Sequence, residues 1–579
     1  MVCVVLYCIG THARLALPQT KPAKSEFTSR SMPLSVPFYS HWAACKRKQQ
    51  SRSAKIASLT RYHDALTENE VRILRTPIHQ IPSSSYSPQE VLLAYGKATF
   101  LAHRETNCIT ECLYDRGELW AKAAKGPFKG IPVSLKDTVS VAGYDSCIAY
   151  SSRIGKPAVE DAPLVKLLVE NGAVPYVKTN VPITMLSFEA YNDVFGVTTN
   201  IWNKDYTPGG STGGESTLLA YGGSRIGIGT DVAGSVRVPA HFTGIYSIRC
   251  STGRFPYSGN ATAMPGQEGV PSVYSPMART LLELEWFLKT LIDCKPWEYD
   301  HYVHPLPWRD VKLKKGKVGV IWTDGVCRPS PACTRALSLA VDAVRKRGYE
   351  TVDMSMTQDD GLEALSLASK LLLADGGEVA TRNFQYGEHN DAGVWNLTFA
   401  ARLPGWLKWI WKLFIRDHVW KTLVQGWGKK STAEFRALVY ARENYRKKWL
   451  DRMNDADVEF VLTVPNATPA LPHKGLAHSV SSCGYTFLFN LLDYTAGVIP
   501  VTTVEPSDAV LPDFRPANKV ERGAFVNYDA CKMAGLPVGV QVVGRRLDEE
   551  RVLKAMHLVQ DGLRDIGVVW KEIEGFSRV

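Results

Sequence analysis

The sequence predicts an α/β protein in which a mixed, largely buried central β-sheet is covered by helices. Short apolar runs alternate along the chain with segments of helical spacing, and this alternation is typical of α/β folds. Apolar runs without polar alternation indicate strands that are buried on both faces. The predicted strands are 130–136, 173–177, 318–322, 458–465, 497–503 and 536–543.

Helix boundary signals support this arrangement. Ser87 followed by Pro88 predicts a capped helix start, because serine accepts a hydrogen bond from the first turn and proline suits the first helical position. Helical spacing over 162–171 stops before Gly172, and a second helix that ends at Arg347 stops before Gly348. Glycine is the residue most often found directly after a helix.

The first 58 residues differ in composition from the rest of the chain. Eight of the eleven net positive charges lie in residues 1–58, which are rich in Ser and Pro and show no apolar period. We therefore predict an irregular basic N-terminal extension over 1–58 and one large domain over 59–570. Because that domain is nearly neutral, no broad basic face and no nucleic-acid partner are expected.

The cysteines and the N-terminus bear on the compartment. The twelve cysteines contain no C-x-x-C pair, which fits reduced, buried thiols of an intracellular protein and gives no zinc site. The apolar stretch Val2–Ile9 is too short to cross a bilayer and lacks the basic residues that precede a signal core. We expect a protein that is cytoplasmic or peripherally associated with a membrane.

Residues 203–235 contain nine glycines, a density that demands tight backbone loops. No lysine follows them as a phosphate loop requires, and Val232 stands where a dinucleotide loop needs its third glycine. Gly209–Gly213 matches the G-x-S-x-G pattern of a nucleophile elbow, but a turn precedes it where a strand is needed. The remaining interpretation is a loop whose N–H groups stabilise an oxyanion.

Acyl transfer needs a nucleophile, a base and N–H donors for the developing negative charge. Ser235 follows Val232-Ala-Gly234, a run that can turn sharply and direct successive N–H groups inward. No histidine near these loops offers itself as the base. Lys136 ends a buried strand, and burial favours the neutral, basic form of lysine. A serine–lysine version of the catalytic triad is therefore a candidate.

Three motifs together resemble the amidase signature family. They are GIPVSLKD at 130–137, GGSTGGE at 209–215 and GTDVAGSVRVPA at 229–240, with spacings of 75 residues from Lys136 to Ser211 and 24 from Ser211 to Ser235. The segments 177–185 and 535–541 are also similar, so that the resemblance covers roughly 60–565. Its nearest branches are fungal acetamidase-type amidases and animal fatty acid amide hydrolases.

The resemblance implies roles for three side chains. Ser235 would be the nucleophile, and Ser211 would bridge it to Lys136 and protonate the leaving amine. A cis peptide bond at Ser211 is expected from the same resemblance. Neither a metal nor an organic cofactor is implied.

The resemblance also implies the surroundings of the nucleophile. The N–H groups of Val232, Ala233, Gly234 and Ser235 would bind the oxyanion, and Met185 would line the substrate site. The pair Asp231 and Arg237 is expected to hold the loop. The sequence departs from many members at Thr212, where a second serine is common, and at Ala233, where glycine is common; the N–H of residue 233 is kept.

Residues 397–430 form a tryptophan-rich basic stretch. Positions 406, 409, 410, 413, 420, 424 and 427 are all apolar and fall on one face of a continuous helix. Tryptophan and leucine beside lysine are typical of a helix that lies in a membrane interface, and the lipid-cleaving branch of the family carries a hydrophobic cap in this place. A core helix or a homodimer face is the alternative interpretation.

The resulting hypothesis is a serine amide hydrolase that cleaves carboxylic or fatty acyl amides. A small-amide hydrolase of the acetamidase type without a membrane role is the alternative. A glutaminase-like amidotransferase subunit would need a partner subunit, in which the tryptophan-rich stretch has no evident use. A non-enzymatic membrane scaffold would not need the complete Lys136, Ser211 and Ser235 set.

Overall fold

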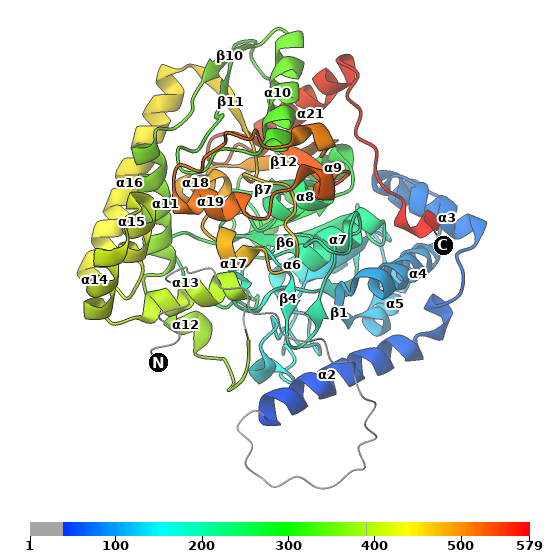
Figure 1. Cartoon of the computed structure of the whole chain (residues 1–579). Helices are drawn as coiled ribbons and strands as arrows, with labels where there is room; N and C mark the ends of the chain where they lie inside the picture. The colour runs from blue at the N-terminus through cyan, green and yellow to red at the C-terminus, as the bar shows by residue number, and fades with distance from the viewer. Residues whose placement is uncertain (1–38, 390, 579) are drawn as a thin grey trace.

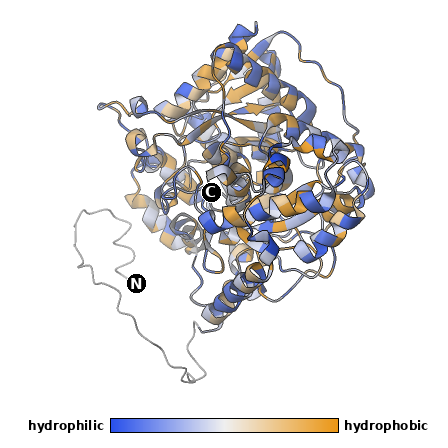
Figure 2. Cartoon of the chain, turned by 90° about the vertical axis from the view of Figure 1, so that its right-hand side faces the viewer, coloured by the Kyte–Doolittle hydropathy of each residue, from blue (hydrophilic) through white to orange (hydrophobic). Residues whose placement is uncertain are grey.

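The computed structural model describes residues 39–389 and 391–578, and its centre is one mixed sheet of eleven strands. The strand order is β1-β3-β2-β6-β8-β7-β12-β13-β11-β9-β10, and helices surround the sheet (Figure 1). Figure 2 shows hydrophobic strand segments within a shell of helices on which hydrophilic and hydrophobic residues alternate. The predicted α/β class with a covered, mixed central sheet is confirmed.

All six predicted apolar runs form strands, with ends displaced by at most two residues, and the described residues contain seven further strands that were not predicted. The structure has the following strands: β1 Ile109–Cys112, β2 Pro132–Lys136, β3 Val174–Thr179, β4 Tyr191–Asn192, β5 Gly196–Val197, β6 Ile226–Asp231, β7 Tyr246–Arg249, β8 Val273–Ala278, β9 Lys317–Val320, β10 Glu350–Asp353, β11 Val458–Thr463, β12 Ala496–Thr503 and β13 Pro537–Val543. Strands β4 and β5 form a separate hairpin.

The helices begin and end largely at the predicted signals; Ser87, for example, forms a capping box with Glu90 at the start of α4. They are α2 Tyr39–Ser58, α3 Glu68–Arg75, α4 Pro88–Thr106, α5 Tyr114–Ala123, α6 Pro163–Glu170, α7 Gly213–Tyr221, α8 Arg237–Thr243, α9 Leu281–Asp293, α10 Pro331–Lys346, α11 Gln358–Leu372, α12 Glu378–Thr381, α13 Ala392–Arg402, α14 Gly405–Phe414, α15 His418–Gly426, α16 Thr432–Asp455, α17 Leu476–Ser479, α18 Gly484–Leu492, α19 Lys519–Phe525, α20 Ala530–Met533 and α21 Glu549–Asp565.

Three neighbouring strands position the candidate site. Strand β2 pairs in parallel with β3 on one side and with β6 on the other, and all three are buried along their whole length. Parallel strands end at the same edge of a sheet. Lys136, Thr179 and Asp231, the last residues of β2, β3 and β6, therefore lie at one edge.

The prediction that 1–58 is irregular is wrong for residues 39–58, which form helix α2; residues 1–38 lie outside the described part of the chain. Helix α2 runs along the lower side of the molecule in Figure 1. It docks through charge, because Lys48 pairs with Glu111 and Asp145 and Arg52 donates to the backbone oxygen of Ile109. A helix that docks through polar side chains leaves no apolar period in the sequence.

The single helical face predicted within 397–430 is also wrong. The stretch contains the end of α13, all of α14 and all of α15 (Figure 1). We call the three helices α13, α14 and α15 the cap. The Asp417 carboxylate accepts a hydrogen bond from the backbone N–H of Trp420, and α15 begins there as a new helix. Trp406 and Trp409 are consequently exposed on α14, whereas Trp427 is buried at the end of α15.

Candidate active site

Lys136 lies at the end of β2 with its side chain fully buried. Its Nζ atom is 2.8 Å from Ser211 Oγ, 3.0 Å from Thr212 Oγ1 and 2.5 Å from Thr230 Oγ1. Burial lowers the pKa of Lys136 to about 7, against the opposing effect of the Asp231 and Glu215 charges. A substantial fraction of this lysine is therefore neutral near neutral pH and able to accept a proton.

The hydrogen bonds of the three hydroxyl groups around Lys136 determine which of them can donate to the lone pair of its nitrogen. A neutral amine has two N–H donors and one lone pair, so that one of three hydroxyl neighbours must donate to the nitrogen. The Thr212 hydroxyl donates to the backbone oxygen of Thr230 and therefore accepts from Lys136. This arrangement leaves Ser211 and Thr230 as the hydroxyls that can donate to Lys136.

Ser211 occupies a tightly packed backbone turn at the start of α7. The Gly210–Ser211 peptide bond is cis, as expected from the resemblance. A Cβ atom at residue 210 would lie 2.4 Å from the backbone oxygen of Ser187, so no side chain fits there. The glycines before Ser211 are thus required by close backbone packing and bring Ser211 to Lys136.

The side chain of Asp231 holds the loop that carries Ser235 in place. Its carboxylate accepts from the Gly234 N–H at 2.8 Å and pairs with Arg237 at 2.9 Å, both side chains being fully buried. Burial by itself raises the pKa of Asp231, but the Arg237 guanidinium outweighs this and holds it below its usual range. The expected structural pair of Asp231 and Arg237 is therefore present.

The same hydrogen bonds narrow the set of oxyanion donors. The N–H of Gly234 is bound to Asp231, so this residue shapes the loop, and its backbone has a φ of 120° that suits glycine. In the described part of the chain, the N–H groups of Val232, Ala233 and Ser235 make no hydrogen bond. These three groups, and not all four that were expected, are available to a developing oxyanion.

Ser235 lines a cavity of about 60 Å³. Met185, Val232 and Ala233 line the same cavity, so the structure brings these expected site residues together with the nucleophile candidate. The remaining wall is mostly apolar and includes side chains from α11, the end of α15 and α18, namely Leu365, Leu372, Trp427, Cys483 and Phe487. Such a wall suits a hydrocarbon group attached to the carbonyl that Ser235 would attack.

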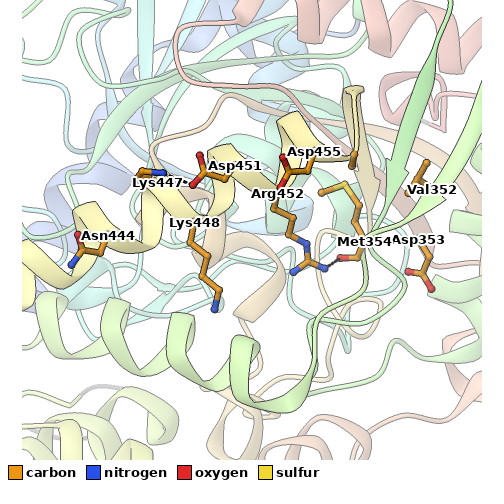
Figure 3. A pocket seen from close by; sticks show the side chains of 10 residues that line it. Val352, Asp353, Met354, Asn444, Lys447, Lys448, Asp451, Arg452 and Asp455 are labelled. Atoms are coloured by element: carbon orange, nitrogen blue, oxygen red, sulfur yellow. Dashed lines mark hydrogen bonds and ion pairs between the residues drawn. The ribbon is translucent and has the colours of Figure 1, made fainter.

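A larger cavity of about 700 Å³ lies elsewhere, between β10 and α16 (Figure 3). Several of its charged side chains have partners within the protein: Lys447 pairs with Asp451, Lys448 pairs with Asp360, and Arg452 donates to the backbone oxygen of Met354. None of the predicted site residues lines it. The smaller cavity beside Ser235 is thus the one of the two that predicted site residues line.

Glu215 is a buried group that sequence reasoning missed. It accepts hydrogen bonds from Thr179 Oγ1 at 2.7 Å and from Ser134, and burial raises its pKa to about 7. Ser134 and Lys136 are two residues apart on β2 and so share a face of the sheet. Two features of the sequence could have indicated this group: the place of Glu215 in the glycine–serine motif, and the serine two residues before Lys136.

Comparison with known proteins identifies the family. The family model described as Amidase matches residues 90–553. Amidase 1 of Gibberella moniliformis is 34% identical over 88% of this chain and 98% of its own length, and fatty-acid amide hydrolase 1 of Sus scrofa is 33% identical over 90% and 92%. A solved structure of a fatty acid amide hydrolase superposes with a TM-score of 0.75 at 28% identity, covering 92% of this chain and 91% of that one. The chain therefore belongs to the amidase signature family of amide hydrolases.

Proposed function

We propose that this amide hydrolase works through an acyl-enzyme on Ser235, with Ser211 as the relay and Lys136 as the base. The observation that carries the proposal is the 2.8 Å contact between Lys136 Nζ and Ser211 Oγ, made by a lysine whose pKa is lowered to about 7. A buried, neutral amine beside a serine hydroxyl is the arrangement that general-base activation requires.

In the first half-reaction, Ser235 Oγ attacks the amide carbonyl carbon. Its proton passes to Ser211 while the Ser211 proton passes to Lys136, and the carbonyl oxygen becomes an oxyanion bound by the free N–H groups of the loop. The C–N bond then breaks as Ser211 protonates the leaving nitrogen and regains a proton from Lys136. The products are an ester on Ser235 and a free amine or ammonia.

In the second half-reaction, water attacks the ester carbonyl and gives its proton to Lys136 through Ser211. The bond to Ser235 Oγ breaks, Ser235 recovers a proton by the same route, and the carboxylic acid leaves. The test is release of acid and amine from a series of linear amides by the purified chain. Ser235→Ala should release neither, and a Ser235→Ala protein with wild-type turnover would contradict the proposal.

The apolar wall of the cavity supports an aliphatic acyl group as the part of the substrate that it holds. Relatives of this chain include proteins named acetamidase as well as fatty-acid amide hydrolase, so both short and long acyl groups are candidates. An aliphatic primary amide series from acetamide upward covers this range.

We further propose that the chain binds membrane surfaces peripherally through α14. Trp406 and Trp409 are 64% and 57% exposed, and Ile410, Leu413 and Phe414 are exposed on the same helix. Aromatic and leucine side chains in this density are typical of a helix in a membrane interface. In the described part of the chain, no helix is long and apolar enough to cross a bilayer.

Sedimentation with anionic liposomes tests the membrane proposal. The wild-type chain should pellet with the vesicles, and salt should weaken the electrostatic part of the binding. A chain that stays in the supernatant at low salt would contradict it.

A further inference from the structure

The cavity beside Ser235 is small for a chain that has a fatty-acid amide hydrolase among its relatives. Its volume of about 60 Å³ compares with roughly 300–1,000 Å³ for sites that enclose drug-sized ligands. A long acyl chain has no room in a cavity of this size. Some part of the wall therefore limits the acyl group, and the wall shows which part.

Trp427 is the largest side chain of that wall, and it is 4% exposed. Its backbone N–H donates to the oxygen of Leu423, and its backbone oxygen accepts from Lys408 Nζ at 2.7 Å. Its ring meets the ring of Trp420 edge to face, with the centroids 5.5 Å apart. These contacts hold the indole in place at the end of α15.

Trp427 belongs to a buried apolar cluster that contains both cavity residues and residues of the cap. Val419, Leu423 and Val424 of α15 belong to the same buried cluster as the cavity residues Val232 and Phe487. Half-buried side chains of the cap, Trp411, Ile415 and Trp420, pack against that cluster. An acyl chain that took the place of the Trp427 side chain would therefore meet apolar side chains of this cluster.

We propose that Trp427 is the residue that limits the length of the acyl group, so that the chain takes amides of short acyl chains. The other large side chains of the wall are less free to move. Leu365 and Leu372 are on α11 and Phe487 is on α18, and these two helices pack against each other. Trp427 both lines the cavity and contacts Trp420 and Lys408 of the cap. This inference rests on the proposed function of the Ser235 cavity.

The test compares rates for primary amides from two to eighteen carbons. Trp427→Ala opens an apolar space, and such spaces bind apolar groups. The ratio of kcat/KM for dodecanamide to that for acetamide should rise by at least roughly tenfold in Trp427→Ala, since each added methylene in an apolar pocket is worth about that much or more. Trp411→Ala is the matched control, because Trp411 is a half-buried tryptophan of the same apolar cluster but does not line the cavity.

A second substitution separates size from polarity. The indole N–H of Trp427 is buried and makes no hydrogen bond among the described residues. Trp427→Phe removes this N–H but keeps a large ring, so it should keep the preference for short amides. A loss of that preference in Trp427→Phe equal to the loss in Trp427→Ala would overturn the size argument.

Two further results would overturn the proposal. One is an unchanged chain-length profile in Trp427→Ala, or in Trp427→Leu if the alanine variant does not fold. The other is a wild-type chain that already cleaves dodecanamide as well as acetamide. Failure of the proposed function looks different, because the wild type would then cleave no amide in the series and Ser235 would not react with a fluorophosphonate probe.

Discussion

The candidate catalytic site and the cap differ in the burial and the contacts of their side chains. Lys136, Ser211 and Asp231 are buried, and each of these side chains is hydrogen-bonded or ion-paired to a neighbour. On α14, by contrast, large aromatic side chains lie open on the surface. This difference teaches that the structure of the site depends on polar contacts, which tolerate few substitutions. The cap depends on apolar surface area, which tolerates more substitutions.

The largest effect should come from Lys136. Lys136→Met keeps the buried volume and removes the amine that contacts Ser211, so kcat should fall by roughly 10²–10⁴ through loss of general-base catalysis. The chain should stay folded, because an apolar side chain suits a fully buried position. Steady-state kinetics and circular dichroism check this, and a variant with wild-type kcat would remove Lys136 from the mechanism.

A large effect on stability is expected from Asp231. Asp231→Asn leaves the buried Arg237 without its charge partner, a loss that costs about 3–5 kcal/mol. Asp293→Asn is the matched control, since Asp293 pairs with Lys289 on the surface, where an ion pair is worth about 0–1 kcal/mol. Urea denaturation compares the two. Equal midpoints for both variants would show that the buried pair does not hold the loop.

A smaller effect, on pH dependence, is expected from Glu215. The negative charge of Glu215 raises the pKa of Lys136, so Glu215→Gln should lower it. The base is active when deprotonated, and the rise of kcat/KM with pH should therefore move to lower pH, by about one unit or less. Thr179→Ser, which keeps the hydroxyl that donates to Glu215, is the control. A shift in the opposite direction would contradict the assignment.

The smallest effect on chemistry should come from the cap. Trp406→Glu combined with Trp409→Glu places charge on exposed positions, so the variant should fold and cleave acetamide at the wild-type rate. Binding to anionic liposomes should be lost, because charged residues do not enter the interface readily. A parallel fall in acetamide turnover would show that the cap acts on the centre directly.

Much of the local structure around the candidate catalytic residues was predictable from the sequence. Apolar runs that end in Lys136 and Val177 predict buried strands, and the glycine pattern around Ser211 predicts close backbone packing. These signals are local, so they survive without knowledge of the fold. The hydrogen bond from Gly234 to Asp231 was not foreseen, because it depends on the detailed course of the loop.

Helix α2 and the cap were less predictable, for a physical reason. Helix α2 docks through Lys48 and Arg52 onto residues more than fifty positions away, and such contacts leave no periodic pattern. In the cap, Asp417 starts a new helix in the middle of an apolar stripe. Only tertiary packing determines that Trp409 is exposed and Trp427 is buried.

One measurement tests the central claim most directly, namely the rate and site of labelling by a fluorophosphonate probe as a function of pH. Ser235 should be the labelled residue, identified by peptide mass spectrometry, and Ser235→Ala should not be labelled. The labelling rate should rise with pH through about 7, where Lys136 loses its proton, and then level off. Labelling of a different residue, or a rate that does not change between pH 5 and about 9, would contradict a Lys136–Ser211–Ser235 mechanism.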